Sequence, residues 1–188
     1  YASSSSVYGA NVKVPFAESD PVDHPISLYA ATKRANELIA HAYAHQYALP
    51  CTGMRFFSVY GPWGRPDMAY YSFARAIVDG TPIELFNHGR HLRDMTYIDD
   101  VVNAITQLID QPAAASPAAP SPADSLAPFR LVNIGTHVSV SLSQLVAALE
   151  IGLGRSAHVR LVDDVKGDLL DTRADIDRIS GSIDFSSH

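Results

Sequence analysis

The sequence is poor in cysteine and contains no long apolar run. Cys51 is the only cysteine among 188 residues, so no disulfide can form within the chain, and a reducing compartment is expected. No apolar stretch approaches the ~20 residues that a membrane-spanning helix needs. The opening serines follow no charged segment of the kind that begins a secretion signal. These absences predict a cytoplasmic protein without a membrane partner.

The sequence also lacks an excess of positive charge. Its formal net charge of −6 gives no general attraction for nucleic acid, so no nucleic-acid partner is expected. A phosphate-bearing small molecule would have to be held by individual Arg and Lys side chains or by backbone N–H groups. With 47% hydrophobic and 18% charged residues, the composition predicts a globular protein with one sizeable core.

Hydrophobic periodicity predicts alternating helices and strands, and therefore an α/β fold. The clearest helix begins at Ser27 and runs to about Leu49, where Pro50 ends it. Further helices are predicted over 68–79, 101–109 and 141–153, the last opened by a capping box of Ser141 and Gln144. Strands are predicted over 51–60, 83–86, 131–134 and 158–162, with a polar loop around Arg90 and Arg93 and no element after 162.

The segment 111–128 differs in composition from the rest of the chain. It holds five of the twelve prolines and seven alanines. Such a composition offers little side-chain surface to bury, so we expect a flexible surface loop inserted between structured elements.

Tyr29 and Lys33 are four residues apart in the predicted long helix, so their side chains lie over the same face. An ammonium group beside a phenol favours the phenolate, which is the form that removes a proton. Ser4 lies in a run of four serines at the end of a predicted strand, where α/β proteins bind ligands. A catalytic base built from these three groups is one interpretation. An ordinary surface pair and a flexible polar terminus are the alternatives.

Five short motifs occur in a fixed order along the chain. They are Ser4-Ser5-Ser6-Val7-Tyr8-Gly9, Tyr29-x-x-x-Lys33, Arg55-Phe56-Phe57-Ser58-Val59-Tyr60-Gly61-Pro62, Arg93-Asp94-x-x-Tyr97-Ile98-Asp99-Asp100 and Asn133-Ile134-Gly135. Together they resemble the NAD-dependent epimerase/dehydratase family of extended short-chain dehydrogenases, from residue 1 to about 175. Within that family the chain is most similar to the UDP-glucuronate 4-epimerases, at 1–11, 23–33 and 61–69.

The resemblance implies the C-terminal part of a Rossmann-type parallel sheet plus a smaller α/β substrate-binding domain, incomplete at both ends. Residues 1–60 would be the C-terminal half of the NAD-binding Rossmann domain. Residues 61–188 would mainly bind the UDP-sugar, with about 90–110 and 130–136 returning to the sheet. The Gly-x-x-Gly-x-x-Gly loop that binds dinucleotides is absent, so we expect a fragment that binds NAD poorly alone.

The resemblance further implies NAD-dependent C4 epimerisation of UDP-glucuronate to UDP-galacturonate through a transient 4-keto intermediate. Tyr29 would remove the C4 hydroxyl proton, Ser4 would position or relay that proton, and Lys33 would tune Tyr29 and contact the nicotinamide ribose. Phe56 joins Tyr29 and Lys33 among the residues implied to bind NAD. A homodimer through the helix that carries Tyr29 is expected for the intact protein.

Residues at both ends of the UDP-sugar are implied as well. Arg65 would hold the uronate carboxylate, while Arg93 would bind the diphosphate through its fork of N–H groups. The other implied contacts are hydroxyls on the carboxylate and an acid on the nucleotide ribose, namely Ser5, Ser6, Ser58 and Asp168. Galactose epimerases of the family carry Arg where this chain has Val165, so the nucleotide end departs from their pattern. A solvated loop charge is the alternative for Arg65.

Other interpretations stay open at this point. Dehydratases of the family typically carry Asp-Glu where this chain has Ser5 and Ser6, which favours epimerisation. An epimerase for a neutral sugar, a decarboxylase, and a non-catalytic module that binds sugar nucleotides or dimerises are the alternatives. No metal site is expected, because His41 and His45 lack a third ligand and are expected to be exposed.

Overall fold

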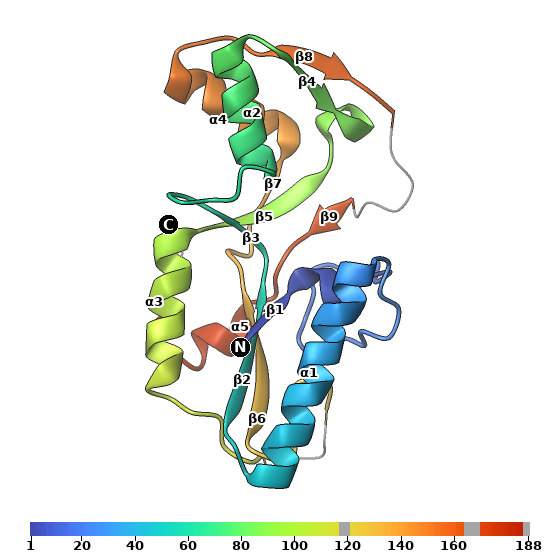
Figure 1. Cartoon of the computed structure of the whole chain (residues 1–188), viewed down its shortest axis with the longest axis vertical. Coiled ribbons are helices and arrows are strands. Elements are labelled where there is room, and N and C mark those ends of the chain that lie inside the picture. Colours follow the sequence, from blue (N-terminus) through green and yellow to red (C-terminus); the bar gives the residue numbers. More distant parts are fainter. Residues whose placement is uncertain (117–120, 164–169, 186–188) are drawn as a thin grey trace.

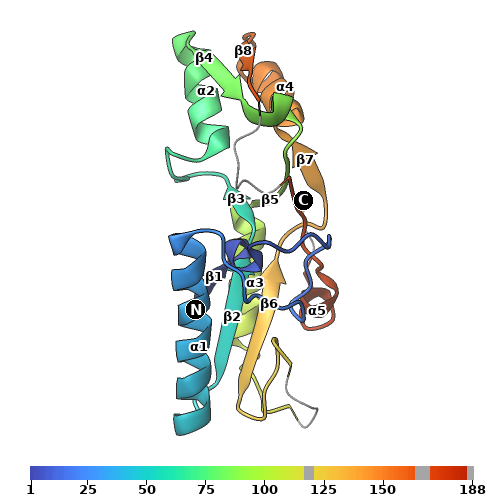
Figure 2. The same ribbon diagram turned by 90° about the vertical axis from the view of Figure 1, so that its right-hand side faces the viewer.

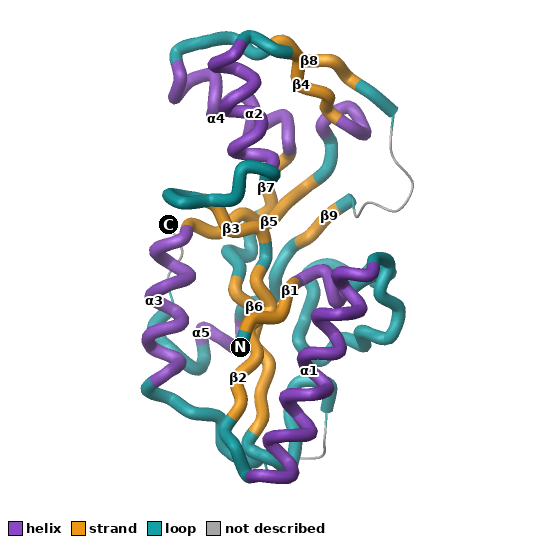
Figure 3. Tube along the Cα trace, in the orientation of Figure 1, coloured by secondary structure: helices purple, strands orange, loops and turns teal. Residues whose placement is uncertain are grey.

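The chain forms small sheets that follow one another along the long axis of the molecule, with helices on their flanks (Figures 1 and 3). The structure, a computed structural model, describes residues 1–116, 121–163 and 170–185. Within those ranges no helix has the length and apolar character needed to cross a bilayer. The predicted α/β fold with parallel strands is confirmed.

The first sheet is parallel and lies between helices (Figure 2). Its order is β1 (Ala2–Ser4), β2 (Cys51–Phe56) and β6 (Phe129–Ile134). Side chains of β6 are buried on both faces, as expected for a parallel strand with helices on each side. Leu131 packs with Ala44 of α1 (Leu28–Tyr47), whereas Val132 packs against α3 (Ile98–Ile109) and the short α5 (Asp177–Ser180).

Helix α1 confirms the predicted long helix to within two residues at its C-terminal end. The hydroxyl of Ser27 accepts a hydrogen bond from the N–H of Ala30 and caps the first turn. The helix ends at Ala48, which is in the left-handed region with φ of 52°. Its exposed face is apolar, with Leu28, Leu38, Ile39, Tyr43 and Tyr47 all about half exposed or more.

The prediction of a single strand over 51–60 is wrong. The chain leaves the first sheet after β2 and enters a second sheet as β3 (Ser58–Tyr60). Phe57 lies between the two strands and is buried in a cluster with Val7 and Tyr8. This anchored side chain marks the point where the strand passes from one sheet to the next.

The second sheet contains a strand where a polar loop was predicted. Its order is β3, β5 (Leu92–Tyr97) and β7 (Ser139–Ser141), and β9 (Asp171–Thr172) pairs with β5. The buried residues of β5 are Asp94 and Thr96, so the strand has no apolar alternation to reveal it. Both β9 and α5 follow position 162, so the expectation of no further element there is wrong as well.

Asp94 connects three segments of the chain. Its carboxylate accepts hydrogen bonds from the N–H groups of Thr136, His137 and Ala174 at 2.7, 3.1 and 3.0 Å. Burial raises the pKa of this carboxyl group, and these donors oppose the rise. The backbone donors hold β5 to the turn after β6 and to the C-terminal segment.

The third sheet pairs β4 (Pro82–Leu85) in parallel with β8 (His158–Leu161), beside α2 (Ala69–Asp79) and α4 (Leu142–Leu153). Its core is formed by Ile77, Ile83, Leu85 and Val146. The capping box at the start of α4 is confirmed, with Gln144 N–H donating to Ser141 Oγ at 3.1 Å and Ser141 N–H donating to Gln144 Oε1 at 2.8 Å. Two 3-10 turns complete the described elements, η1 (Ser5–Tyr8) and η2 (Phe86–Gly89).

The segment 111–128 buries more than its composition predicts. Ala113, Ala123, Ser125 and Ala127 are all buried, although residues 117–120 lie outside the described part. Ala123 and Ala127 pack between α1 and β6. His41 Nε2 lies 2.8 Å from Ser125 Oγ and the ring is half-buried, so the expectation that His41 is exposed is wrong.

Candidate active site

A cavity of about 440 Å³ lies at the carboxyl ends of β1 and β2. Ser4 and Phe56 are the last residues of these strands and are partners in the parallel register. Ligands of α/β proteins bind at this edge of a sheet. The lining includes seven of the residues that the sequence analysis singled out: Ser4, Ser5, Tyr29, Lys33, Phe56, Ser58 and Arg65.

Tyr29 and Lys33 enter the cavity from the first turns of α1. The Lys33 ammonium lies 5.7 Å from the centroid of the Tyr29 ring and donates a hydrogen bond to the carbonyl of Ala2 at 3.3 Å. The Tyr29 side chain is 52% exposed. The phenol is therefore open to a ligand while a positive charge stands beside it.

Ser4 is held by its neighbour Ser6. The Ser4 hydroxyl oxygen accepts hydrogen bonds from the N–H and the hydroxyl of Ser6, at 3.2 and 3.0 Å. A serine hydroxyl has two acceptor sites and one proton. Its proton is therefore the part of the group that can be donated to a ligand. Ser6 therefore holds the Ser4 hydroxyl in place through hydrogen bonds. Ser6 itself, although predicted to bind the substrate, does not line the cavity.

Arg65 lies on the loop 61–68 that joins β3 to α2. The loop opens at Gly61, whose φ of 134° and closeness to Ile98 leave no room for a Cβ atom. The Arg65 guanidinium holds the Asp67 carboxylate with two hydrogen bonds, Nε to Oδ1 at 3.0 Å and Nη2 to Oδ2 at 2.5 Å. These bonds hold the pKa of Asp67 below its usual value. The Arg65 guanidinium thus binds a carboxylate in the bidentate manner, through Nε and Nη2.

Arg93, like Ser6, is a predicted substrate residue that does not line this cavity. Arg93 lies in β5, where it is half-buried and its Nη1 donates to the carbonyl of Leu92 at 2.9 Å. Asp168 and the neighbouring Val165 lie outside the described residues. The predictions for the diphosphate and the nucleotide ribose therefore stay predictions.

A buried ion pair behind the cavity was missed by the sequence analysis. Arg55 of β2 and Glu37 of α1 are joined by two hydrogen bonds, Nε to Oε1 at 2.9 Å and Nη2 to Oε2 at 3.0 Å, and neither side chain is exposed. Ser3, which lines the cavity, donates its hydroxyl to Glu37 Oε1 at 2.6 Å. The signal in the sequence is an arginine inside the apolar strand Gly53-Met54-Arg55-Phe56-Phe57, because a buried charge requires a partner.

The model of the NAD dependent epimerase/dehydratase family matches residues 1–121, which is more than half of the chain. The chain belongs to this family. A Staphylococcus aureus relative named Protein CapI is 52% identical over 98% of this chain and 57% of its own length. A Rhizobium meliloti relative named probable UDP-glucuronate 4-epimerase is 48% identical over 98% of this chain and 55% of its own length. The chain therefore spans little more than half the length of these relatives.

Solved structures of the epimerase/dehydratase family have the same fold. UDP-glucuronic acid 4-epimerase from Bacillus cereus, solved in complex with UDP-glucuronic acid and NAD, is 29% identical and superposes with a TM-score of 0.81. The match covers 100% of this chain and 55% of that one. This chain thus corresponds in fold to about half of that epimerase.

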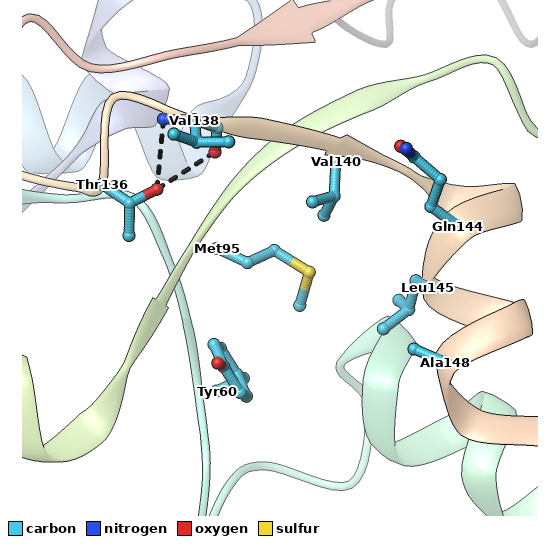
Figure 4. A pocket seen from close by; sticks show the side chains of 8 residues that line it. All are labelled: Tyr60, Met95, Thr136, Val138, Val140, Gln144, Leu145 and Ala148. Carbon is cyan, nitrogen blue, oxygen red and sulfur yellow. Dashed lines mark hydrogen bonds between the residues drawn. The ribbon is translucent and has the colours of Figure 1, made fainter. Parts of the chain in front are cut away.

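A second cavity, of about 490 Å³, has a mainly apolar lining, to which Tyr60, Thr136 and Gln144 add polar groups (Figure 4). It lies between β5, β7 and α4, and the side chains of Met95, Val140 and Leu145 point into it. Such a lining offers few hydrogen-bond partners and no charged partner for a phosphorylated sugar. In the described ranges there is also no cluster of three or more His, Cys, Asp or Glu side chains that could bind a metal ion. The first cavity is therefore the better candidate site.

Ionised Glu37 stabilises the fold, so we predict that the free energy of unfolding falls in acid. Burial alone would raise its pKa, but hydrogen bonds from Arg55, Ser3 and Arg34 outweigh burial, and the pKa lies below the ordinary value of 4.5. The stabilisation by ionised Glu37 is therefore fully present above pH 4.5 and is lost as the pH falls through the lower, folded-state pKa. The contribution of Glu37 is the difference in unfolding free energy between wild type and Glu37→Gln. Urea unfolding of both proteins at about pH 7 and about pH 4 measures this difference.

The two proteins should differ less in unfolding free energy at the acid pH. Glu18 and Asp94, whose pKa values burial raises, act in the opposite direction, but they are common to both proteins and cancel in the difference. A difference between the two proteins that is independent of pH would contradict the assignment to Glu37.

Proposed function

We propose that this chain carries the catalytic groups of an NAD-dependent epimerase that converts UDP-glucuronate to UDP-galacturonate through a transient 4-keto sugar. The observation that carries the proposal is the single cavity shared by Ser4, Tyr29, Lys33 and Arg65. It combines a base, a proton donor and a carboxylate-binding group at one edge of the sheet. The coverage of the relatives supports an active protein of about their length, of which this chain forms part.

The proton-transfer chemistry rests on Tyr29 and its neighbours. Tyr29, whose ring centroid lies 5.7 Å from the Lys33 ammonium, would remove the proton of the C4 hydroxyl. The hydroxyl of Ser4, whose oxygen is already engaged by Ser6, would donate to the sugar oxygen at the same position. The return of a proton to C4–O by Tyr29 would complete the cycle.

The residues that line the cavity fit the nicotinamide end of NAD. Tyr29, Lys33 and Phe56 line the cavity beside hydroxyl donors, and they would hold the nicotinamide and its ribose. When bound, NAD would accept hydride from C4 and return it to the opposite face of the sugar ring. The sequence contains no Gly-x-x-Gly-x-x-Gly loop for the diphosphate of NAD, so that contact is assigned to residues outside these 188.

The carboxylate of a uronic acid fits the environment of Arg65. The side chain is 71% exposed, and its present partner, Asp67, is 63% exposed. Exposed ion pairs contribute little to stability because solvent screens them, so a substrate carboxylate can replace Asp67 at small cost. Ser5 and Ser58 line the same cavity and would add hydroxyl donors, whereas no acid stands where dehydratases carry Asp-Glu.

A homodimer is the proposed assembly. The exposed face of α1 is apolar and carries Leu28, Ile39 and Tyr43 at 82%, 57% and 54% exposure. Apolar faces of this kind mark contacts between proteins. A two-fold pairing of α1 helices would bury the same face of each subunit.

The direct test is NMR of UDP-glucuronate incubated with NAD⁺ and the full-length protein that contains this chain. We expect resonances of UDP-galacturonate at the expense of those of UDP-glucuronate. A UDP-pentose with release of CO₂ would identify a decarboxylase instead. Conversion of UDP-glucose alone would identify an epimerase for neutral sugars, and no conversion of any UDP-sugar would favour a non-catalytic binding module.

Arg65→Leu should weaken the use of UDP-glucuronate. Removing a charge-assisted pair of hydrogen bonds to the substrate should lower kcat/KM by about 10–150-fold. Steady-state kinetics on the full-length enzyme measure this change. Arg75→Leu is the matched control, because Arg75 is equally exposed and also pairs with an aspartate, Asp79, but lies on α2 outside the cavity lining. Equal kinetics for both variants would remove Arg65 from the site.

A further inference from the structure

We propose that the buried pair of Glu37 and Arg55 positions the base for the proposed epimerisation. These two residues do not touch the substrate in this proposal. They set the place of α1, and with it Tyr29, relative to Ser4 on β1. The inference rests on the proposed function for its kinetic consequence, but the positioning itself can be measured without a substrate.

Helix α1 is attached to β1 at two successive turns. Lys33 donates to the carbonyl of Ala2 at 3.3 Å, and Glu37, one turn later, accepts from the hydroxyl of Ser3 at 2.6 Å. The next residue of β1 is Ser4, whose hydroxyl lines the cavity. The two contacts therefore set the register between the helix that carries Tyr29 and the strand that carries Ser4.

Arg55 makes this attachment rigid. It is the register partner of Ser3 in β2, and its two hydrogen bonds to Glu37 engage both carboxylate oxygens. Two parallel N–H···O bonds fix orientation as well as distance. The guanidinium also lies 4.8 Å from the centroid of the Tyr8 ring, which packs in a separate cluster. Arg55 thus connects α1, β1 and β2 at one point.

Stability alone does not account for an ion pair at this position. Both side chains are fully buried, and buried ion pairs are often no more stabilising than well-packed apolar residues of similar size. Their fixed geometry is what apolar packing does not reproduce. A helix that slides by one residue moves by about 1.5 Å, which is more than the roughly 0.5 Å within which catalytic groups must be held.

The test compares three forms of the full-length enzyme with wild type: Glu37→Gln, the apolar double variant Glu37→Leu/Arg55→Met, and Asp124→Asn. The double variant removes both fully buried charges and leaves only the partly exposed Arg34 without its carboxylate partner, so it should fold. Asp124→Asn is the control, because Asp124 lines a pocket together with Arg34 and Glu37 but forms its ion pair with Arg178 of α5. We expect kcat for UDP-glucuronate to fall by at least about 10-fold in the first two variants, with KM within about 3-fold, and to stay unchanged in the control.

Crystal structures of wild type and the double variant give the second measurement. We expect the Tyr29 hydroxyl to move relative to Ser4 Oγ by more than about 0.5 Å in the double variant. A double variant with wild-type kcat and an unmoved Tyr29 would overturn the proposal and leave the pair a purely structural role. If wild type converts no UDP-sugar, the proposed function fails, while the crystal structures still decide whether the pair positions Tyr29.

Discussion

Tyr29→Phe is expected to lower kcat for UDP-glucuronate by about 10²–10⁴-fold, because the substitution removes the only atom that accepts the C4 hydroxyl proton in the proposed reaction. The ring stays in place, so KM should change little. The NAD content of the purified full-length enzyme should also be retained, because Lys33 and Phe56 still line the site. Product formation followed by NMR measures the effect.

Tyr43→Phe is the matched control for this experiment. Tyr43 lies on the same helix and is exposed to a similar extent, 54% against 52% for Tyr29, but it does not line the cavity. Its kcat should equal that of wild type. Normal turnover by Tyr29→Phe would remove Tyr29 from the role of base, whatever the substrate proves to be.

Arg55→Met should produce the largest loss of stability. Removing one partner of a buried pair leaves the other charge uncompensated, which costs about 3–5 kcal/mol. Arg34 still donates to Glu37 Oε2 at 3.0 Å, so we expect the lower end of that range. Urea unfolding of the full-length protein at neutral pH gives the change in the free energy of unfolding.

Adding Glu37→Leu to Arg55→Met should recover much of this loss. The second substitution removes the carboxylate that the first one left unpaired, so the two effects are strongly non-additive. Arg75→Met, which breaks only the exposed pair with Asp79, should change stability by less than about 1 kcal/mol. A double variant that is less stable than Arg55→Met alone would contradict the account of Arg55 as the counter-ion of Glu37.

Elements with local signals were predictable from the sequence. Helix α1 has its capping serine at Ser27 and a proline shortly after its last turn, and α4 carries both halves of its capping box within four residues. The motifs that identified the family are also local. Six of the predicted site residues that line the cavity lie in these motifs, and the seventh, Arg65, lies in the stretch 61–69.

Elements that depend on distant partners were not predictable in this way. Strand β5 was missed because its buried residues, Asp94 and Thr96, are polar, and Asp94 is satisfied by donors 42 to 80 residues away. The alanines near the end of the segment 111–128 were expected at the surface. They are buried because α1 and β6 cover them, which composition alone does not express.

The sequence by itself determined the spacing of Tyr29 and Lys33 on one helix face, because helical periodicity acts within a few residues. Only the tertiary structure decided that Arg65 reaches the same cavity as Ser4, since the two lie on different elements and no local pattern relates them. It also decided that Arg55 and Glu37 meet. A charge in a buried apolar strand requires a partner, which the sequence alone indicates. The identity of that partner depends on which side chain lies beside Arg55 when α1 packs on the sheet.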